Sequence, residues 1–461
     1  MFYNRLDKNL STEINGEPGM FRRDKYLYQL IDSRNNHQVK VITGLRRSGK
    51  SYLINEIFFN WLKEHGIDKK HIVKFAFDSE IDIRQLDTYL PSEPTIVKII
   101  EGQRIINNRK FMLFIDDHTK EEGDYIFLLD EIQNLDDFVR VLNGYLYLNR
   151  FDIFVTGSNS RFLSSQVDTE FGGRAHRIHV LPLTFSEYLT GVSLYKRDAL
   201  DEYIRYGGIS LIELRTTDEG KSNEAISIYK ETYLKDIKDR HPQVGENNLD
   251  TTLKVIASMI SSPINPTKIE NTFNSAFNLK LSNNVIGNYI NWFEEAYLIN
   301  KVLRYNVKGR NYIGTPFKIY FEDIGIRNAI LNFREVDETD LIENVVYNEL
   351  RYRGFNVDVG VVTIKTKSGR KDKNGNDIYV DKDTECDFVA NKGNKTYYLQ
   401  VALRIDDQEK KDHEYESLRN IPNSFKKVIV VKEEGKHYYT NEGFLRIGLL
   451  DFLLNQDSLD W

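Results

Sequence analysis

The sequence predicts an α/β protein built on a parallel sheet, followed by a helical segment and a second, smaller α/β unit. Three observations lead to this prediction. An apolar run at 39–43 ends in a Gly-x-x-x-x-Gly-Lys-Ser loop at 44–51, and a helical pattern follows. A second apolar run at 125–129 ends in two acidic residues, as expected for a strand buried on both faces of a parallel sheet. Between 250 and 323, three helix-like segments precede two strand-like ones.

The loop at 44–51 has the residue types and spacing that bind phosphate. Its glycines allow backbone angles that bring N–H groups close to phosphate oxygens. The helix that follows adds free N–H groups and the positive end of its dipole. Lys50 can reach the β- and γ-phosphates of a nucleotide, and the Ser51 hydroxyl can ligate Mg²⁺. We therefore predict a nucleotide site formed by Gly44, Arg47, Ser48, Gly49, Lys50, Ser51 and Tyr52.

Asp130 and Glu131 follow the apolar run at 125–129, at the end of the strand where α/β proteins place ligand groups. We expect Asp130 to hold Mg²⁺, usually through water, and Glu131 to polarise the attacking water. The alternative is an acidic turn after a core strand. The position of the pair about 80 residues after the phosphate loop favours the hydrolytic interpretation.

Two further sets of candidate residues each have a functional and a purely structural interpretation, and both interpretations stay open. Ser158 and Asn159 follow a strand predicted at 152–156 and either sense the γ-phosphate or form a strand-end turn. Arg174 follows two glycines and precedes a strand predicted at 177–181. It either swings onto the γ-phosphate of a neighbouring chain or is a solvated surface arginine, the commoner fate of an arginine.

Composition limits the class of protein. The 461 residues suggest about three domains at a usual ~150 residues each, and 40% of them are hydrophobic. A net charge of -6 argues against a protein coated in nucleic acid and leaves room for a local basic groove. The one cysteine, Cys386, excludes an internal disulfide and fits a reducing cytoplasm. No stretch has signal-peptide or membrane-span character, so we expect a soluble cytoplasmic protein without membrane partners.

Four phrases together resemble a widespread family of bacterial and archaeal AAA-type ATPases, which join the ATPase module to a winged helix and a C-terminal domain of unassigned function. They are Gly-Leu-Arg-Arg-Ser-Gly-Lys-Ser at 44–51, Leu-Asp-Glu-Ile-Gln at 129–133, Thr-Gly-Ser-Asn-Ser at 156–160 and Leu-Pro-Leu-Thr-Phe-Ser-Glu-Tyr at 181–188. The resemblance implies that Lys50 and Ser51 bind ATP and Mg²⁺. It also implies that Asp130 and Glu131 serve hydrolysis, and that Arg174 acts in trans within a homo-oligomer.

The resemblance and the pattern changes divide the chain into three expected domains. Residues 1–245 would form the AAA-type ATPase domain with a helical lid, and 246–335 a winged-helix domain. Residues 336–461 would form a restriction-endonuclease-like domain. Within the second, three helices and a β-hairpin are typical of a winged helix. Its third helix carries Asn283, Asn284 and Asn288 and no Lys or Arg, so DNA contact and protein docking both stay open.

In the C-terminal domain, a helix glutamate, a strand aspartate and a following strand resemble the restriction-endonuclease core. The resemblance implies that Glu343, Asp387 and Gln400 converge on a divalent metal, with a lysine two residues after the last of them. This chain has Ala402 there, so the cation that steadies an attacking hydroxide is missing. We therefore favour an α/β scaffold over a nuclease, with Cys386 as a small core hydrophobe.

The predicted function is ATP hydrolysis that drives a conformational cycle, with three uses in competition. The protein remodels DNA, or it is a nucleotide switch that recruits a protein partner or client, or it is an ATP-licensed nuclease. The secondary structure expected around the site includes helices at 21–31 and 89–109 and a strand at 72–77.

Overall fold

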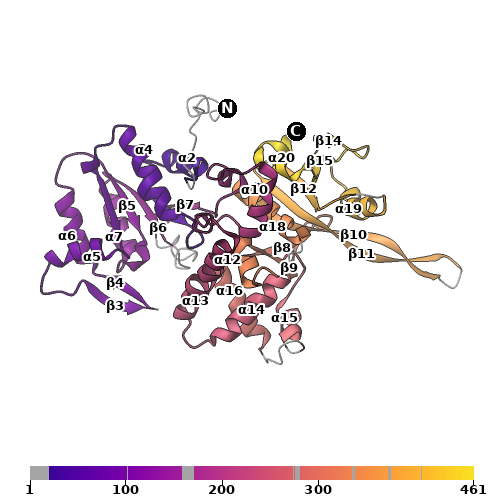
Figure 1. Cartoon of the computed structure of the whole chain (residues 1–461), viewed down its shortest axis with the longest axis horizontal. Coiled ribbons are helices and arrows are strands. Elements are labelled where there is room, and N and C mark those ends of the chain that lie inside the picture. The colour runs from indigo at the N-terminus through magenta and orange to yellow at the C-terminus, as the bar shows by residue number, and fades with distance from the viewer. Residues whose placement is uncertain are drawn as a thin grey trace.

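A computed structural model describes residues 20–100, 102–157, 171–273, 275, 281–334, 338–371, 375–405, 408–433 and 435–461. Figure 1 shows an N-terminal α/β module at one end of the long axis and a mixed body at the other. Ser158 and Asn159 lie outside the described residues. In the part of the chain that the structure describes, every helix is too short or too polar to cross a lipid bilayer.

The N-terminal module contains a five-stranded parallel sheet in the order β2-β5-β6-β1-β7. Its strands are β1 (Val39–Thr43), β2 (Ile72–Ala76), β5 (Tyr125–Asp130), β6 (Phe151–Thr156) and β7 (Ala175–His179). All five were predicted from apolar runs, and the structure confirms them with small shifts in their ends. Every residue of β1 and β5 is buried, as the continuous apolar runs predict.

Helices cover both faces of this sheet. On one face pack α2 (Asp24–Asp32) and the continuous helix made of α3 (Lys50–Tyr52), a π-helical segment (Leu53–Phe58) and α4 (Phe59–Glu64). On the other pack α6 (Asn108–His118) and α7 (Phe138–Tyr147). Two short helices, α5 (Glu80–Gln85) and the 3₁₀ helix Leu86–Thr88, follow β2. This three-layer arrangement confirms the predicted α/β class.

The helix predicted at 89–109 is wrong. Its second half contains a two-stranded hairpin, β3 (Ile96–Ile100) and β4 (Gln103–Ile106). The sequence of β3 is Ile-Val-Lys-Ile-Ile, whose β-branched side chains favour a strand, and Gly102 turns the chain with a φ of 75°. A helix begins only at Asn108, after Asn107 caps it by accepting hydrogen bonds from the N–H groups of Arg109 and Lys110.

A group of helices follows the five-stranded sheet where a helical lid was expected, and we call this group the lid. It consists of α9 (Phe185–Tyr188), α10 (Lys196–Tyr206), α11 (Ser210–Glu213), α12 (Asp218–Ser227), a π-helical segment (Ile228–Leu234) and α13 (Lys235–Arg240). Three helices come next, α14 (Glu246–Ser258), α15 (Pro266–Thr272) and α16 (Asn283–Glu295), and then the hairpin β8 (Ile299–Asn306) and β9 (Asn311–Phe321). This is the element order expected for 246–335.

The β8–β9 hairpin belongs to the sheet of the C-terminal segment. That sheet has eight strands in the order β14-β15-β13-β12-β11-β10-β8-β9, and β8 runs parallel to β10. The other strands are β10 (Asn356–Lys371), β11 (Asp377–Lys392), β12 (Lys395–Ala402), β13 (Lys426–Val431), β14 (Tyr438–Tyr439) and β15 (Leu445–Gly448). The expected boundary between 335 and 336 therefore falls between elements that share one sheet.

One hydrophobic core joins the lid, the three-helix segment and one face of this sheet. The helices α17 (Ile324–Ile330), α18 (Glu338–Tyr352) and α20 (Leu449–Leu454) complete it, while α19 (Gln408–Arg419) covers the opposite face. Cys386 lies buried in the core beside α19, as predicted. Because lid and C-terminal sheet share a core, we expect them to move together relative to the nucleotide sheet.

Candidate nucleotide site

The phosphate loop connects the end of β1 to the start of α3. Gly44 has a φ of 138°, and a Cβ at this position would lie 2.2 Å from the carbonyl oxygen of Val180. A residue with a side chain would not fit there unless Val180, which directly follows β7, moved. Gly49 has a φ of 90° and caps the helix that begins at Lys50. Arg47 also adopts a left-handed conformation, with a φ of 67°. The two predicted glycines are thus required by backbone geometry.

Lys50 and Ser51 start the helix and point into the loop region and toward β5. The Lys50 Nζ donates hydrogen bonds to the carbonyl oxygens of Gly44 at 3.0 Å and Leu45 at 2.9 Å. Burial lowers the pKa of Lys50, while Glu131 and Asp130 act in the opposite direction. The Ser51 Oγ donates to Asp130 Oδ1 at 3.1 Å. Residues 79 positions apart therefore meet at the carboxyl edge of the sheet.

Asp130 is the centre of a polar network. Besides Ser51, it accepts hydrogen bonds from Asn55 Nδ2 at 3.3 Å and from the Thr156 hydroxyl at the end of β6. Burial raises the pKa of Asp130, Glu131 raises it further, and the hydroxyl hydrogen bonds lower it. Oxygen donors crowded at one buried place are a fitting environment for Mg²⁺. Ser51 and Asp130 are the residues that would hold the ion.

Glu131 follows with a φ of 52°, which turns it out of the strand. Its N–H donates to Thr156 Oγ1 at 3.0 Å, and the Gln133 side chain donates to its Oε2. Thr156 and Gln133 therefore orient the acidic pair, a role that sequence reasoning missed. The available signal was the position of Thr156 at the end of the strand predicted at 152–156.

A cavity of about 620 Å³ lies beside these residues, within the usual range for small-molecule sites. Its polar wall is formed by the phosphate loop, Asp78 and Glu131. Its apolar wall includes Phe21, which precedes α2, and Leu211 and Leu214 of the lid. The buried Ser48 hydroxyl has no hydrogen-bond partner among the described residues. A phosphate oxygen in the loop would give it one, so the chain's own groups fit a nucleoside triphosphate.

The lid contacts the phosphate loop directly. The Arg46 guanidinium forms an ion pair with Asp236 of α13 at 2.5 Å, and the Tyr233 hydroxyl donates to the Arg46 carbonyl oxygen at 3.0 Å. The polar segment at 236–240 thus includes a residue that binds the loop. A change in the loop's position would act on the lid through these two bonds.

A second chain of contacts leads from the end of β1 into the C-terminal body. The hydroxyl of Thr43, the residue before Gly44, lies 3.3 Å from His179 Nδ1. The other ring nitrogen of His179 bonds the buried Glu322 after β9, and Glu322 pairs with Arg351 of α18 at 2.8 Å. Burial alone would raise the pKa of Glu322, but His179 and Arg351 outweigh it and lower the pKa to about 2.

Arg174 is exposed at the start of β7, where its carbonyl oxygen accepts a hydrogen bond from the N–H of Val39 at 2.8 Å. Because β1 and β7 run parallel, this is the amino edge of the sheet, opposite the phosphate loop. Arg174 is thus separated from Lys50 of its own chain by the length of β1. The structure brings Lys50, Ser51, Asp130 and Glu131 together and leaves Arg174 apart.

The carboxylates of the C-terminal domain surround a lysine. The Lys318 Nζ lies 3.0 Å from Glu343 Oε1 and 2.6 Å from Glu385 Oε1. Burial raises the pKa of the adjacent Asp387, Glu343 raises it further, and Lys318 lowers it. Glu343 and Asp387 therefore converge as the resemblance implied, but around an ammonium group from β9. No group of three or more His, Cys, Asp or Glu among the described residues is arranged to hold a metal ion.

The expectation that Gln400 joins this cluster is wrong. Its amide donates to Glu414 Oε2 at 3.2 Å and accepts from Ser417 Oγ at 3.4 Å, both on α19. Glu343 lies on α18, which packs on the other face of the sheet. The alternation of side chains along β12 places Gln400 on the α19 face, so it cannot reach the carboxylates.

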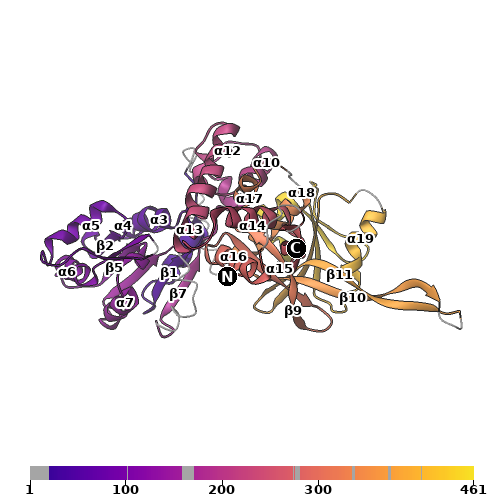
Figure 2. The same ribbon diagram turned by 90° about the horizontal axis from the view of Figure 1, so that it is seen from below.

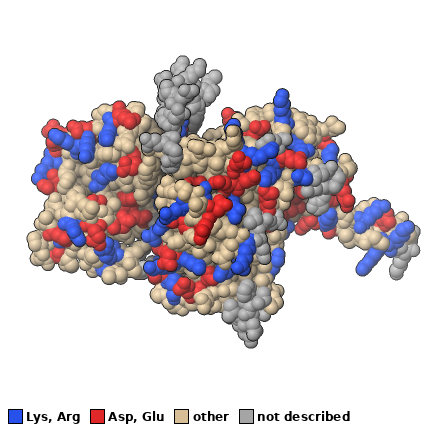
Figure 3. Space-filling model, viewed as in Figure 1, with Lys and Arg blue, Asp and Glu red and all other residues tan. Residues whose placement is uncertain are grey.

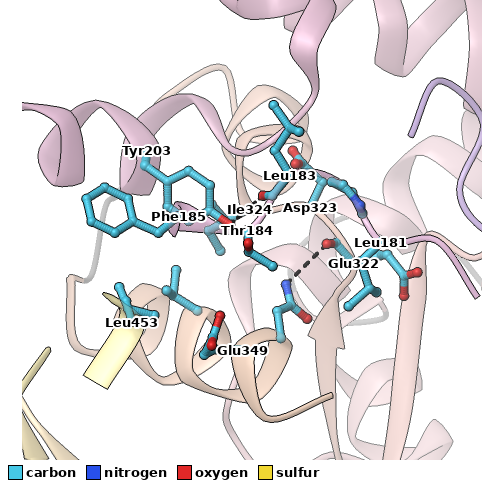
Figure 4. Close-up of a pocket in the computed structure, with 13 residues that line it drawn as sticks. Leu181, Leu183, Thr184, Phe185, Tyr203, Glu322, Asp323, Ile324, Glu349 and Leu453 are labelled. Atoms are coloured by element: carbon cyan, nitrogen blue, oxygen red, sulfur yellow. Dashed lines mark hydrogen bonds between the residues drawn. The ribbon is translucent and has the colours of Figure 1, made fainter. Parts of the chain in front are cut away.

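Figure 4 shows a small cavity where the nucleotide module, the lid and α18 meet, lined by residues that include Asp323 and Glu349. Its volume of about 20 Å³ accommodates one water molecule. Burial raises the pKa of Glu349 to about 7. Arg353 and Lys25 act to lower this pKa, and Glu187 acts to raise it. Burial likewise raises the pKa of Asp323 to about 6, although backbone N–H groups lower it.

Because the pKa values of Asp323 and Glu349 are raised, we expect the protein to lose stability as pH rises from 5.5 to 7.5. The folded state retains protons that the unfolded state has released in this range, so raising pH favours unfolding. Glu322, with its lowered pKa, acts only below about pH 4.5. The urea midpoint should therefore be lower at pH 7.5 than at pH 5.5, and Glu349→Gln should reduce the difference. A midpoint that rises over this range would contradict the prediction.

Comparisons with known proteins agree with this geometry. Residues 36–189 match the family model of the AAA domain, and residues 197–337 match a domain of unknown function (DUF8612). An uncharacterized protein of Haemophilus influenzae is 29% identical over 444 residues, which cover 94% of this chain and 99% of that protein. The uncharacterized protein MJ1544 of Methanocaldococcus jannaschii is 28% identical over 345 residues, covering 72% and 70%.

Among solved structures, the Aeropyrum pernix ORC2 protein in ADPNP–ADP complexes aligns with a TM-score of 0.34 and 15% identity, covering 63% of this chain and 90% of that one. Residues 36–189 thus match the model of an AAA domain, and the phosphate loop and the acidic pair described above lie within this range. The chain as a whole is similar to proteins that are themselves uncharacterized.

Proposed function

We propose that the protein binds and hydrolyses ATP in the presence of Mg²⁺ and couples its nucleotide state to a conformational change. The observation that carries the proposal is the convergence of Lys50, Ser51, Asp130 and Glu131 at one edge of the sheet, beside a cavity of about 620 Å³. These are the groups that a P-loop hydrolase needs to bind phosphate, hold a metal and polarise water.

Each residue has a distinct role in this proposal. Lys50 exchanges its bonds to two loop carbonyls for the β- and γ-phosphates. Ser51 and Asp130 hold Mg²⁺, which neutralises phosphate charge when bound. Glu131, oriented by Gln133, accepts a hydrogen bond from the attacking water. Gly44, Arg47, Ser48, Gly49 and Tyr52 complete the binding loop, and Ser158 and Asn159 are proposed γ-phosphate sensors.

The coupling follows the two contact chains out of the loop. One runs through Arg46 to Asp236 on the lid, and the other through His179 and Glu322 to α18. Because the lid and the C-terminal sheet share one core, movement at the loop would act on a single body. We propose that this body remodels DNA, in a cytoplasmic homo-oligomer. Recruitment of a protein client by a nucleotide switch is the alternative. Stimulation of ATPase activity by DNA would favour remodelling over the switch.

An ATP-licensed nuclease has less support. Lys318 pairs with Glu343 and Glu385 and neutralises the place where a metal would have to bind, and Gln400 lies on the other face of the sheet. We therefore propose that the ATPase domain (1–245) and the following segment (246–335) act on a C-terminal domain (336–461) that serves as a scaffold.

The direct test is nucleotide binding by a Lys50→Ala chain. Removal of the buried ammonium takes away the cation for the β- and γ-phosphates, so affinity for ATP should fall at least about tenfold, as expected when a charge-assisted bond is lost. Fluorescent ATP-analogue titration measures it. Lys63→Ala, an exposed lysine on the same continuous helix, is the matched control. Unchanged ATP affinity in Lys50→Ala would show that the loop is not the nucleotide site.

A further inference from the structure

Beyond the body of the protein, β10 and β11 continue as a two-stranded arm (365–371 and 377–383), which Figures 1 and 2 show projecting from the sheet. Within the body, β8 pairs with 359–361 of β10, and β12 pairs with 388–392 of β11. In the part of the chain that the structure describes, no third strand continues along the arm. Because a two-stranded ribbon alone is marginally stable in water, we expect a partner to stabilise the arm.

One face of the arm carries charges that the arm itself balances. In the antiparallel ladder, Lys365 lies opposite Asp381, and Lys367 lies opposite Tyr379. Directly opposite residues share a face of the ribbon, so these four side chains lie on one face. The Lys367 ammonium also pairs with Asp377 at 2.5 Å. This charged face is therefore suited to water.

The other face of the arm is apolar. Thr366 lies opposite Val380, and the alternation of side chains places Ile378 on the same face. Ile378 and Val380 are 38% and 46% exposed, and Figure 3 shows both tan and blue surface on the arm. At the root of the arm this face enters the core beneath α19, because Ile364 belongs to the same hydrophobic cluster as Tyr415 of that helix. The apolar face thus extends beyond the helix that covers its root.

The tip of the arm and the helix at its root carry opposite charges. Arg370 and Lys371 are exposed near the tip. On α19, Glu409, Asp412 and Glu416 follow one another at helical spacing, and Glu416 forms an ion pair at the root of the arm. Two of these three carboxylates pair within their own chain, so a cation from outside would add most at the exposed Glu409.

We propose that the apolar face of the arm docks on the same face of a second copy of this chain, with the two arms antiparallel about a two-fold axis. This contact is isologous and buries Ile378 and Val380 of both copies between ribbons that pack ~10 Å apart. Seven residues at ~3.3 Å each make the arm about 23 Å long. Each tip therefore reaches the other copy's α19, which lies on the same side of the sheet as the apolar face. There Arg370 and Lys371 meet Glu409.

Charge favours this stacking over pairing of the arm's edges. Two antiparallel β11 strands in registers centred on Tyr379, Val380 or Asp381 would place aspartates of both copies opposite each other. Two β10 strands centred on Thr366 would likewise bring lysines together. Like charges directly opposite destabilise a pair of strands, and charged edges are a usual device against edge pairing. The stacked apolar faces bring no like charges together.

The test is sedimentation velocity of the full chain in EDTA and without nucleotide, over about 1 to 100 µM. The interface is smaller than the standard ~1,600 Å², so the dimer should be weak, with a Kd on the order of 10 µM. Ile378→Ser with Val380→Ser should weaken dimerisation at least about tenfold, because aliphatic side chains of both copies lose their burial. Arg370→Glu with Lys371→Glu should also weaken it, and the addition of Glu409→Lys should restore it.

Tyr379→Ser is the matched control, because it removes a 56% exposed side chain from the charged face; this variant should dimerise as the native chain does. A second readout is cross-linking by a short bismaleimide. Val380→Cys chains should be linked into dimers, whereas Lys365→Cys chains, changed on the opposite face, should not. The native Cys386 is buried, and thermal unfolding of each variant verifies that it is folded.

A monomer at every concentration would overturn the proposal, as would a dimer that Ile378→Ser with Val380→Ser leaves unchanged or that Tyr379→Ser weakens equally. Absence of rescue by Glu409→Lys would overturn the antiparallel arrangement. A monomeric chain that binds phosphatidylcholine–phosphatidylserine vesicles through the same face would assign the face to lipid instead. The inference does not rest on the proposed function: a Lys50→Ala chain that neither binds nor hydrolyses ATP should dimerise as the native chain does.

Discussion

A Glu131→Gln chain should bind ATP as the native chain does and hydrolyse it at least ~10²-fold more slowly, in line with losses of a general base. The substitution keeps the size of the side chain and removes the charge that polarises water. The backbone bond from Glu131 to Thr156 does not depend on the side chain, so the left-handed turn at this position should persist. Single-turnover hydrolysis at saturating ATP separates this effect from binding.

The control for this substitution is Glu56→Gln, which changes an exposed glutamate in the helix that follows the phosphate loop and should leave turnover unchanged. Native turnover in Glu131→Gln would remove Glu131 from the mechanism. Asp78, which lines the same cavity, would then be the next carboxylate to substitute.

The convergence of the candidate site's residues could be predicted from the sequence because these residues follow strand ends. Gly44 and Gly49 mark the loop, and Asp130 and Glu131 follow an apolar run. A parallel sheet brings such carboxyl ends to one edge. That argument anticipated the contact between Ser51 and Asp130. It did not extend to Thr156 and Gln133, because a hydroxyl or amide that orients an acidic pair has no distinctive spacing of its own.

Long-range partners in the C-terminal part were harder to predict. Lys318 comes from a hairpin that the sequence assigned to the preceding domain, and only the pairing of β8 with β10 brings it to Glu343 and Glu385. The face of the sheet on which the Gln400 side chain lies depends on side-chain alternation along β12. A shift of one residue would place it on the other face. Neither pairing nor register is encoded in a short motif.

The helix wrongly predicted at 89–109 had a local cause. Its apolar residues also suited a strand, and short apolar runs do not separate the two by periodicity alone. The β-branched sequence of β3 and the turn at Gly102 were the signals that could have corrected it.

An Arg174→Ala chain should bind ATP but hydrolyse it at least ~10³-fold more slowly, the loss expected when an arginine that neutralises transition-state charge is removed. Arg174 is exposed at the amino edge of the sheet, whereas the phosphate loop lies at the carboxyl edge. The five residues of β1 separate the two edges by about 17 Å at ~3.3 Å per residue. Its own γ-phosphate is therefore out of reach, and we propose that it acts on a neighbour's within a homo-oligomer.

Two consequences distinguish a trans-acting arginine from a surface one. Specific ATPase activity of the native chain should rise with protein concentration until assembly is complete. Mixing Arg174→Ala chains with Lys50→Ala chains should restore activity, because a Lys50→Ala chain still offers Arg174 to an intact pocket beside it. Arg140→Ala, an exposed arginine of α7, is the control and should behave as the native chain. If activity per chain is independent of concentration, or if verified mixed assemblies show no rescue, Arg174 is a solvated surface residue and the proposed oligomer is not required for hydrolysis.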